Sequence, residues 1–212
     1  AASDVYKRQD VNNPNVKLEY KSQETTFNIT VNDPIQSLSV ATPMTQGEYD
    51  HGDTLNFAGL TLAAVTKSGA TKTITNTTPG LAISETQADV NSPNFTKITG
   101  TSNVEVKGTQ IIKFTYDGKT AQQTIIVNDR ISSVNIVTQP NKTAIKYGEA
   151  LDLTGATVKI TLASGDTTNI SLPDGSATIS AFNNKQIGSK QKLTVTINNK
   201  TAPETIDVEA YN

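Results

Sequence analysis

The chain has 212 residues, which is room for one large domain or for two domains of about 100 residues. Lys and Arg number 18 against 20 Asp and Glu, and the net charge of −2 argues against a nucleic-acid or membrane-surface partner recruited by bulk charge. The absence of cysteine excludes disulfides, thiolate metal sites and cysteine nucleophiles. No apolar run is long enough to span a bilayer. One histidine leaves few tools for acid–base chemistry, so we do not expect an enzyme.

The first nine residues are expected to be a non-native tail. They contain neither an initiating Met nor a signal-peptide core, and residues 3–9 resemble translated sequencing-adapter read-through. A genuine polar linker is the alternative. Under either interpretation we exclude residues 1–9 from the fold and expect the chain to be cut from a longer protein.

Threonine and asparagine are unusually frequent, with 33 and 19 residues. Threonine is β-branched and fits the half-exposed face of a sheet, whereas asparagine favours the turns between strands. No stretch has the periodicity of a helix. The composition therefore predicts an all-β protein, and a thiol-free surface rich in Thr and Asn is typical of extracellular bacterial modules.

The strongest signal is an internal repeat. Residues 52–62 (GDTLNFAGLTL) return 96 positions later as residues 148–158 (GEALDLTGATV), and residues 35–40 return at the same offset as residues 131–136. Solenoid repeats are 20–50 residues long, whereas a β-sandwich domain of about 100 residues buries a core of its own. We therefore expect self-sufficient sandwich domains in tandem.

The same offset sets the predicted domain limits. Residues 16–33 match residues 112–129, whereas the corresponding strands of the last copy follow after 81 residues and that copy is shorter. We predict the C-terminal strands of a truncated preceding repeat at 10–33, a whole domain at 34–129 and a shorter domain at 130–212.

Each repeat is expected to contain about seven short antiparallel strands. In the first whole repeat, residues 35–40 and 55–65 read as strands, residues 67–70 as a hairpin turn and residues 71–74 as the return strand. Asp117-Gly118 predicts a second hairpin turn, and Asn198-Asn199 replaces it in the last copy. The predicted fold class is all-β, with tandem immunoglobulin-like antiparallel β-sandwiches.

Two stretches of the last repeat resemble a known family. Residues 147–158, and residues 191–197 with the closing residues 206–208, are similar to bacterial Ig-like domains of group 3. The resemblance covers essentially all of residues 16–212 and implies tandem modules of large surface proteins, mostly of Gram-positive bacteria. The middle copy departs from the pattern at residues 50–53 and carries an extra stretch at 84–107.

No residue stands out as a catalytic, cofactor-binding or metal-binding group. His51 occupies the position of Tyr147 one repeat later, which favours a packing role over a metal or catalytic role. Carboxylates are scattered and form no recognisable pair, although counting alone does not exclude a glycosidase-like pair. We predict no enzyme activity, no catalytic site, no metal site and no cofactor.

The repeats are joined by short Asn-Asp junctions, at Asn32-Asp33 and Asn128-Asp129. Their oxygens could help to hold Ca²⁺, but a simple turn of the chain is the favoured interpretation. A Lys–Asn isopeptide cross-link, known in Gram-positive Ig-like adhesins, is a further hypothesis without an identified pair. Residues 84–107 form either a recognition loop or, as we prefer, a surface excursion or added edge hairpin.

The sequence favours a non-catalytic spacer or stalk of an exported bacterial surface protein, located at the cell surface or in the cell wall, with a role in adhesion. Its expected partners are neighbouring repeats of the same chain and a surface protein or glycan, and not a nucleic acid; we expect a monomer without a membrane span. The alternative is an accessory carbohydrate-binding module of an extracellular glycosidase. Sugar-binding faces usually stack rings on Trp or Tyr; Trp is absent, and Tyr20, Tyr49, Tyr116 and Tyr147 look structural.

Overall fold

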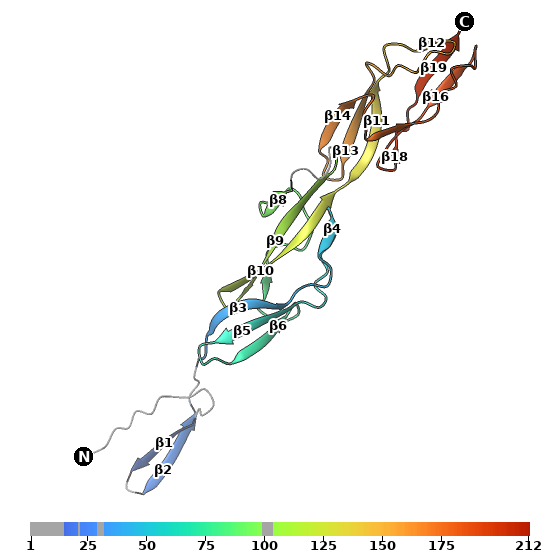
Figure 1. Cartoon of the computed structure of the whole chain (residues 1–212). Coiled ribbons are helices and arrows are strands. Elements are labelled where there is room, and N and C mark those ends of the chain that lie inside the picture. Colours follow the sequence, from blue (N-terminus) through green and yellow to red (C-terminus); the bar gives the residue numbers. More distant parts are fainter. Residues whose placement is uncertain (1–14, 21, 29–31, 99–103) are drawn as a thin grey trace. The chain divides into compact units, whose positions relative to one another are not determined.

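The computed structural model describes residues 15–20, 22–28, 32–98 and 104–212 (Figure 1). Every regular element in this part of the chain is a β-strand, so the all-β prediction is confirmed. Among the described residues there is no helix of the length and hydropathy that a membrane span requires. The predicted tail, residues 1–9, lies outside the described residues.

The chain divides into two compact units. The first unit takes in the described residues up to Thr45, residues 57–84 and residues 113–123. The second unit takes in residues 46–56, the described part of 85–112, and residues 124–212. The division passes through the two long strands β9 (Val106–Tyr116) and β10 (Lys119–Asp129). The predicted boundaries of the repeats stay predictions.

The first unit begins with a hairpin of β1 (Asn15–Tyr20) and β2 (Gln23–Asn28), which pair antiparallel over their full length. The connecting turn includes Ser22, whose φ is 63°. These strands lie within residues 10–33, where the sequence predicts the closing strands of a preceding repeat. Their assignment to a truncated repeat stays a prediction.

A three-stranded antiparallel sheet forms the main layer of the first unit. Across the sheet its strands are β3 (Ile35–Thr42), β5 (Thr61–Thr66) and β6 (Thr71–Thr75). The predicted strand 55–65 is wrong in its first half, because residues 55–60 lie outside any strand and residues 57–60 form a turn closed by the Leu60 N–H and the Phe57 carbonyl. Leu55 and Leu60 are nevertheless buried, so the apolar spacing at these positions reflects burial outside a strand.

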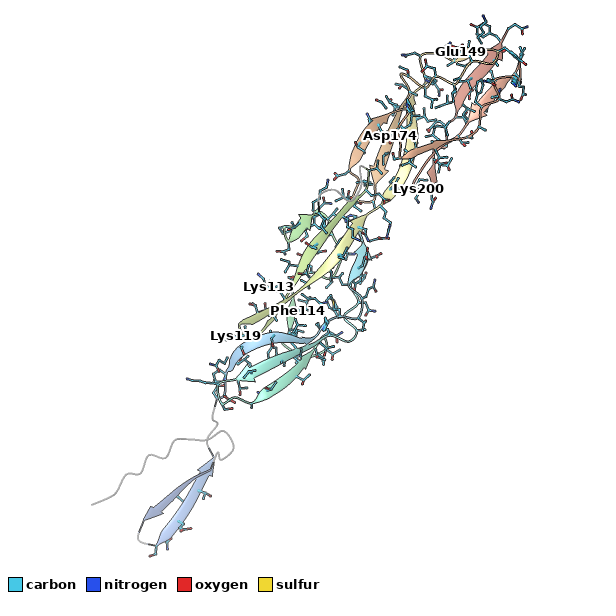
Figure 2. The ribbon with its side chains drawn as sticks, viewed as in Figure 1. Lys113, Phe114, Lys119, Glu149, Asp174 and Lys200 are labelled. Atoms are coloured by element: carbon cyan, nitrogen blue, oxygen red, sulfur yellow. The ribbon has the colours of Figure 1, made fainter. Side chains whose placement is uncertain are left out.

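The first unit also contains the hairpin end of β9 and β10, where β7 (Ala82–Ile83) pairs antiparallel with β9. Lys113 and Phe114 are neighbours on β9 and lie on opposite faces of it (Figure 2). Lys113 is exposed, whereas Phe114 is fully buried. The Phe114 ring meets the ring of Phe57 edge to face, with the ring centroids 6.4 Å apart. Alternating faces of one strand thus separate the solvent side from the core.

The second unit carries the rest of β9 and β10 with two short strands beside them. β4 (Glu48–Asp50) pairs parallel with β10, and β8 (Phe95–Lys97) pairs antiparallel with β9. Because β8 lies within the extra stretch 84–107, part of that stretch is an added strand, one of the two interpretations that the sequence left open.

Residues 130–212 complete the second unit with three three-stranded sheets, β11-β13-β14, β12-β19-β16 and β15-β17-β18. One apolar cluster takes side chains from all three, among them Val134, Ile160, Leu193 and Val195. A single core fed from opposing sheets is the arrangement of a β-sandwich. The strands are β11 (Ile131–Thr138), β12 (Ala144–Lys146), β13 (Thr157–Leu162), β14 (Thr167–Ser171), β15 (Ala177–Ile179), β16 (Lys190–Leu193), β17 (Val195–Ile197), β18 (Lys200–Thr201) and β19 (Ile206–Tyr211).

The sequence repeat is also a repeat of strand register. Val40 lies opposite Leu62 between β3 and β5, and Ile136 lies opposite Val158 between β11 and β13. Every other partner pair of these strands is shifted by the same 96 positions, and both pairs have their register irregularities at matching places. The matched residues of the two copies therefore occupy equivalent places in two equivalent sheets.

Turns predicted from the sequence contain residues with positive φ. In the β9–β10 hairpin, Asp117 and Gly118 have φ values of 47° and 71°, and Asn198 and Asn199 have 43° and 64° in the corresponding turn. Positive φ at both central positions is the backbone of a type I′ turn, which Asn, Asp and Gly tolerate best. The two predicted hairpin turns are confirmed.

Gly59 and Gly155 form a matched pair that no other residue could replace without strain. Their φ values are 79° and 91°. A Cβ at Gly59 would lie 2.8 Å from Thr45 Cγ2, and a Cβ at Gly155 would lie 2.4 Å from Asn141 Oδ1. The repeated glycine thus serves backbone conformation and close packing rather than chemistry.

Candidate functional site

His51 lies in the turn that follows β4 and is half-buried. Its Nδ1 accepts the N–H of Val90 at 3.3 Å and lies 3.4 Å from Asp89 Oδ1. Its own backbone N–H donates to the carbonyl of Asn128 at 2.8 Å. The ring thus ties two loops together, as a packing residue does, but the matching Tyr147 is 52% exposed and does not pack in the same way.

Carboxylates with shifted pKa values hold turns and ion pairs. The Lys142 ammonium, 2.6 Å from Glu149, and the N–H of Lys146 lower the pKa of Glu149. The hydroxyl and N–H of Ser176 lower the pKa of Asp174. Glu149 and Asp174 lie apart in the second unit (Figure 2). A carboxylic acid that acts as a general acid needs a raised pKa, which is the opposite direction.

The junction before residue 34 is built around Asp33. Its Oδ1 accepts the N–H of Ser68 at 2.9 Å and its Oδ2 accepts the Ser68 hydroxyl at 2.8 Å. Ser68 is in the turn between β5 and β6, and the neighbouring Lys67 N–H donates to the carbonyl of Pro34 at 2.9 Å. Hydrogen bonds from Thr66 and Ser68 lower the pKa of Asp33. The residue that precedes one repeat thus holds the hairpin of that repeat.

The junction before residue 130 has the same construction 96 positions later. Asp129 Oδ1 accepts the N–H of Ser164 at 3.0 Å, and the N–H of Ala163 donates to the carbonyl of Arg130 at 2.9 Å. Asp129 is fully buried, and its Oδ2 makes no hydrogen bond with any residue that the structure describes. We call the pairs Asp33–Ser68 and Asp129–Ser164 the two hairpin clamps.

Further polar groups surround the second clamp. Glu48 Oε1 accepts hydrogen bonds from Asn128 Nδ2 at 2.9 Å and from Lys107 Nζ at 3.0 Å. These two donors, Asn128 before Lys107, lower the pKa of Glu48. Arg130 Nε lies 2.7 Å from Asp50 Oδ1, and this contact raises the pKa of Arg130. Both partners of each ion pair are at least one-third exposed, so each pair contributes little to stability.

The cluster of Lys107, Glu48 and Asn128 has the residue types of an isopeptide cross-link, which sequence analysis could not locate. Attack of the Lys amine on the Asn amide releases ammonia and needs a neutral amine and a proton donor. The side chains of Lys107 and Glu48 are 36% and 51% exposed, and the lowered pKa keeps Glu48 ionised at neutral pH. This environment favours an ion pair over the cross-link.

The Asn-Asp junctions were also a hypothetical calcium site. In the second junction, Asn128 directs its amide nitrogen to Glu48, and Asp129 uses Oδ1 on a backbone N–H. No three acidic or histidine side chains converge as metal ligands within the described parts of the chain. Asn128 and Asp129 are the last two residues of β10, so the second pair does not form the turn that the sequence favoured. The calcium site stays a hypothesis.

A shallow polar depression of about 320 Å³ lies over residues 85–93 of the second unit. The buried Gln110 binds the loop that lines the depression, because its Oε1 accepts the N–H of Asp89 at 2.9 Å while its Nε2 donates to Glu85 and to the carbonyl of Gln87. Glu85 also accepts the hydroxyl of Ser92 at 2.8 Å. The carboxylate that would be the natural ligand-binding group is therefore engaged in holding the loop.

Two exposed tyrosines lie beside each other in residues 130–212. Tyr147 is 52% exposed and Tyr211 46% exposed, and the N–H of Tyr147 donates to the carbonyl of Tyr211 at 2.7 Å. Ile187, 45% exposed, pairs with the neighbouring Ala210. The sequence predicted a structural role for Tyr147 and did not single out Tyr211; tyrosines beside the ends of paired strands would have been the signal.

Comparisons with known proteins identify the fold. Residues 138–210 match the family model of the bacterial Ig-like domain (group 3), which confirms the resemblance and the Ig-like sandwich for this segment. A search of curated proteins found no match.

Two solved structures are similar at a low level. One is the solution structure of a protein thought to be a surface protein; it is 20% identical, covers 39% of this chain and 89% of that chain, and has a TM-score of 0.26. The other is the surface layer protein SbsC, domains 4–9, which is 14% identical, covers 92% of this chain and has a TM-score of 0.23. This chain spans 34% of that protein chain. Such low scores carry no argument about function.

Proposed function

We propose that the chain is a non-catalytic segment of tandem Ig-like repeats from an exported bacterial surface protein, where it acts as a semi-rigid spacer or stalk. In this proposal the segment lies outside the cell, at the surface or in the cell wall. It contributes to adhesion by holding a binding domain of the parent protein at a distance from the wall. Its main partners are the neighbouring repeats of its own chain, and it is a monomer.

The repeated hairpin clamp is the observation that carries this proposal. Asp33 and Asp129 each close one repeat and accept the N–H of a serine in the next hairpin, at 2.9 and 3.0 Å. Domains joined by a linker move relative to one another unless their interface restrains them. A side chain of one repeat bonded to the turn of the next is such a restraint, and it is built twice at the same offset.

Spin labels can test the stiffness of the second junction. The chain has no cysteine, so cysteines introduced at Lys97 on β8 and Lys200 on β18 would be the only labelling sites. A control pair at Lys159 and Lys200 lies within one repeat. We expect pulsed EPR to give one narrow distance distribution for both pairs. A distribution much broader for the Lys97 pair than for the control would refute a stiff spacer.

Surface location has its own test, because it does not follow from stiffness. Antibodies against the chain should label intact cells of the source bacterium, and external protease should remove the label. Label that appears only after the cells are lysed would contradict an exported surface protein. Light scattering of the purified chain should give the mass of one copy.

A second candidate function is glycan binding, the role of an accessory carbohydrate-binding module. The exposed Tyr147 and Tyr211, joined through their backbones, favour it, because sugars stack on exposed aromatic rings. A glycan array should then show binding that Tyr147→Ala and Tyr211→Ala remove and that Tyr49→Phe, at a buried position, retains. An array without any bound glycan would leave only the spacer role.

A further inference from the structure

One side chain in the core of residues 130–212 comes from outside that repeat. Val104 is 7% exposed and belongs to the apolar cluster whose other buried members lie between Ile131 and Val208. Val106 is partly buried against the same cluster. Both valines lie in the stretch 84–107, the extra segment of the preceding repeat. The core of one sandwich is therefore completed by its neighbour.

The residue between the two valines also acts on the following repeat. Glu105 Oε1 accepts the backbone N–H of Ile131, the first residue of β11, at 3.1 Å. Its charge contributes to the raised pKa of the neighbouring Arg130. Three consecutive residues thus serve the next repeat, one by full burial, one by partial burial and one by a charge-assisted hydrogen bond.

We propose that residues 104–106 form a clasp, an interaction surface whose partner is the following repeat of the same chain and which couples the unfolding of the two repeats. Val104 gains its burial only while both repeats are folded, so its contribution stabilises each repeat conditionally on the other. Such coupling is reciprocal by thermodynamic necessity. This inference rests on the proposed spacer role. In a spacer, two repeats whose unfolding is coupled resist bending and stretching together.

Amide hydrogen exchange on the full chain tests the apolar half of the clasp. Val104→Ala should make the amides of β13 and β17, both in the following repeat, exchange roughly tenfold faster, because it opens a cavity in their core. The matched control is Val137→Ala, which truncates a valine that is 54% exposed on β11. Equal exchange of β13 and β17 in the two variants would overturn the clasp.

The hydrogen bond of Glu105 can be tested with two variants that leave the apolar core unchanged. Glu105→Ala removes the acceptor of the Ile131 N–H, whereas Glu105→Gln keeps an oxygen in its place. We expect the Ile131 amide to exchange several-fold faster in Glu105→Ala and at close to the wild-type rate in Glu105→Gln. The same rate in all three proteins would show that Glu105 takes no part.

If the coupling is reciprocal, a change in the core of the following repeat must also affect the clasp. Val195→Ala, a truncation in the buried core of the following repeat, should speed exchange at Val104 and Val106 across the junction. If exchange changes only within residues 130–212, the coupling is refuted. Amide exchange reports on the clasp, whereas the EPR distances report on the stiffness of the spacer. Failure of one proposal can therefore be distinguished from failure of the other.

Discussion

The hairpin clamps at the two junctions share their backbone geometry. Asp33 and Asp129 lie 96 positions apart, and so do Ser68 and Ser164, whose N–H groups they accept at 2.9 and 3.0 Å. In both places the residue before the serine donates its N–H, at 2.9 Å, to the residue after the aspartate. The junction is thus a repeated structural motif in its own right.

The surroundings of the two carboxylates differ. Asp33 is half-buried, and the hydroxyls of Thr66 and Ser68 lower its pKa. Asp129 is fully buried, and Leu162 stands where Thr66 stands in the other copy. Leucine offers no hydroxyl, and the Ser164 hydroxyl accepts the N–H of Asp166. Asp129 Oδ2 has no hydrogen-bond partner among the described residues, whereas Asp33 Oδ2 accepts the hydroxyl of Ser68.

Because of this difference, the two carboxylates are expected to affect the stability of the fold and the geometry of docking differently. A half-exposed carboxylate with bonded oxygens costs little to fold, whereas a buried one with an unpartnered oxygen costs desolvation that one hydrogen bond does not offset. A buried polar group can still select one docking geometry over others. We therefore infer that the second clamp fixes orientation at some cost in stability, and the first clamp does not carry that cost.

The largest expected effect is that the same Asp→Asn substitution changes the free energy of unfolding in opposite directions at the two clamps. Asp129→Asn keeps the oxygen that accepts the Ser164 N–H and removes the buried charge, so we expect the free energy of unfolding to rise by about 1–3 kcal/mol. Asp33→Asn weakens charge-assisted hydrogen bonds and should lower it. Urea unfolding with amide exchange in the β5–β6 and β13–β14 hairpins measures both. Changes of the same sign would contradict the comparison.

A swap of the neighbouring residue sharpens the comparison. Leu162→Thr places a hydroxyl beside Asp129, as Thr66 does beside Asp33. The variant loses core packing, but a double-mutant cycle with Asp129→Ala should reveal a favourable coupling of about 0.5–1.5 kcal/mol between the new hydroxyl and the carboxylate. A coupling of zero would mean that the missing hydroxyl does not explain the unpartnered oxygen.

The pH dependence should come partly from the first clamp. The pKa of Asp33 in the folded chain is lowered from the usual 3.8, so its stabilising contribution is present above that value and lost as the pH falls through the lowered pKa. We expect Asp33→Asn to flatten the fall of the melting temperature below about pH 4. Parallel melting curves for wild type and variant would contradict a role for Asp33 in acid unfolding.

The smallest expected effect concerns the exposed pair of Arg130 and Asp50. The side chains are 57% and 47% exposed, so Arg130→Gln should change the free energy of unfolding by less than about 1 kcal/mol. Raising the salt concentration from about 0.05 to about 0.5 M should remove most of that difference. A larger effect that resists salt would make this pair, and not the clamp, the main restraint of the junction.

Short residue patterns predicted many strands and turns correctly, because each pattern occurs in both copies of the repeat. Asp117-Gly118 and Asn198-Asn199 could be recognised as turns because few other residues tolerate positive φ at two consecutive positions. The register of β3 with β5 followed from the same offset as that of β11 with β13. Apolar spacing alone failed at residues 55–60, where the buried Leu55 and Leu60 lie outside any strand.

The strand register of the last repeat changes within its final hairpin, and the 96-residue offset did not reveal this change. Ile197 lies opposite Lys200 in the hairpin, whereas Lys190 lies opposite Glu209, so the register shifts by two between the inner and outer pairs. Pro203 lies in the break, and proline has no N–H for the ladder. A proline in a sequence that otherwise reads as a strand was the available signal.

The junction contacts lay beyond what sequence could supply. Val104 sits in an extra stretch without strand periodicity, and its burial depends on a core formed by residues 131–208. Glu105 and Asp129 are ordinary carboxylates in the sequence, and only the docked hairpin gives them partners. Contacts between repeats combine residues that no short-range pattern connects.

The central claim is that side chains at the junction hold one repeat in a fixed orientation to the next. Residual dipolar couplings of backbone amides test it directly, with β8 and the Val106–Ile112 and Thr124–Asp129 parts of β9 and β10 as one set and β11–β19 as the other. A single alignment tensor should fit both sets. Two tensors of clearly different magnitude would show that the repeats reorient freely and would contradict the account.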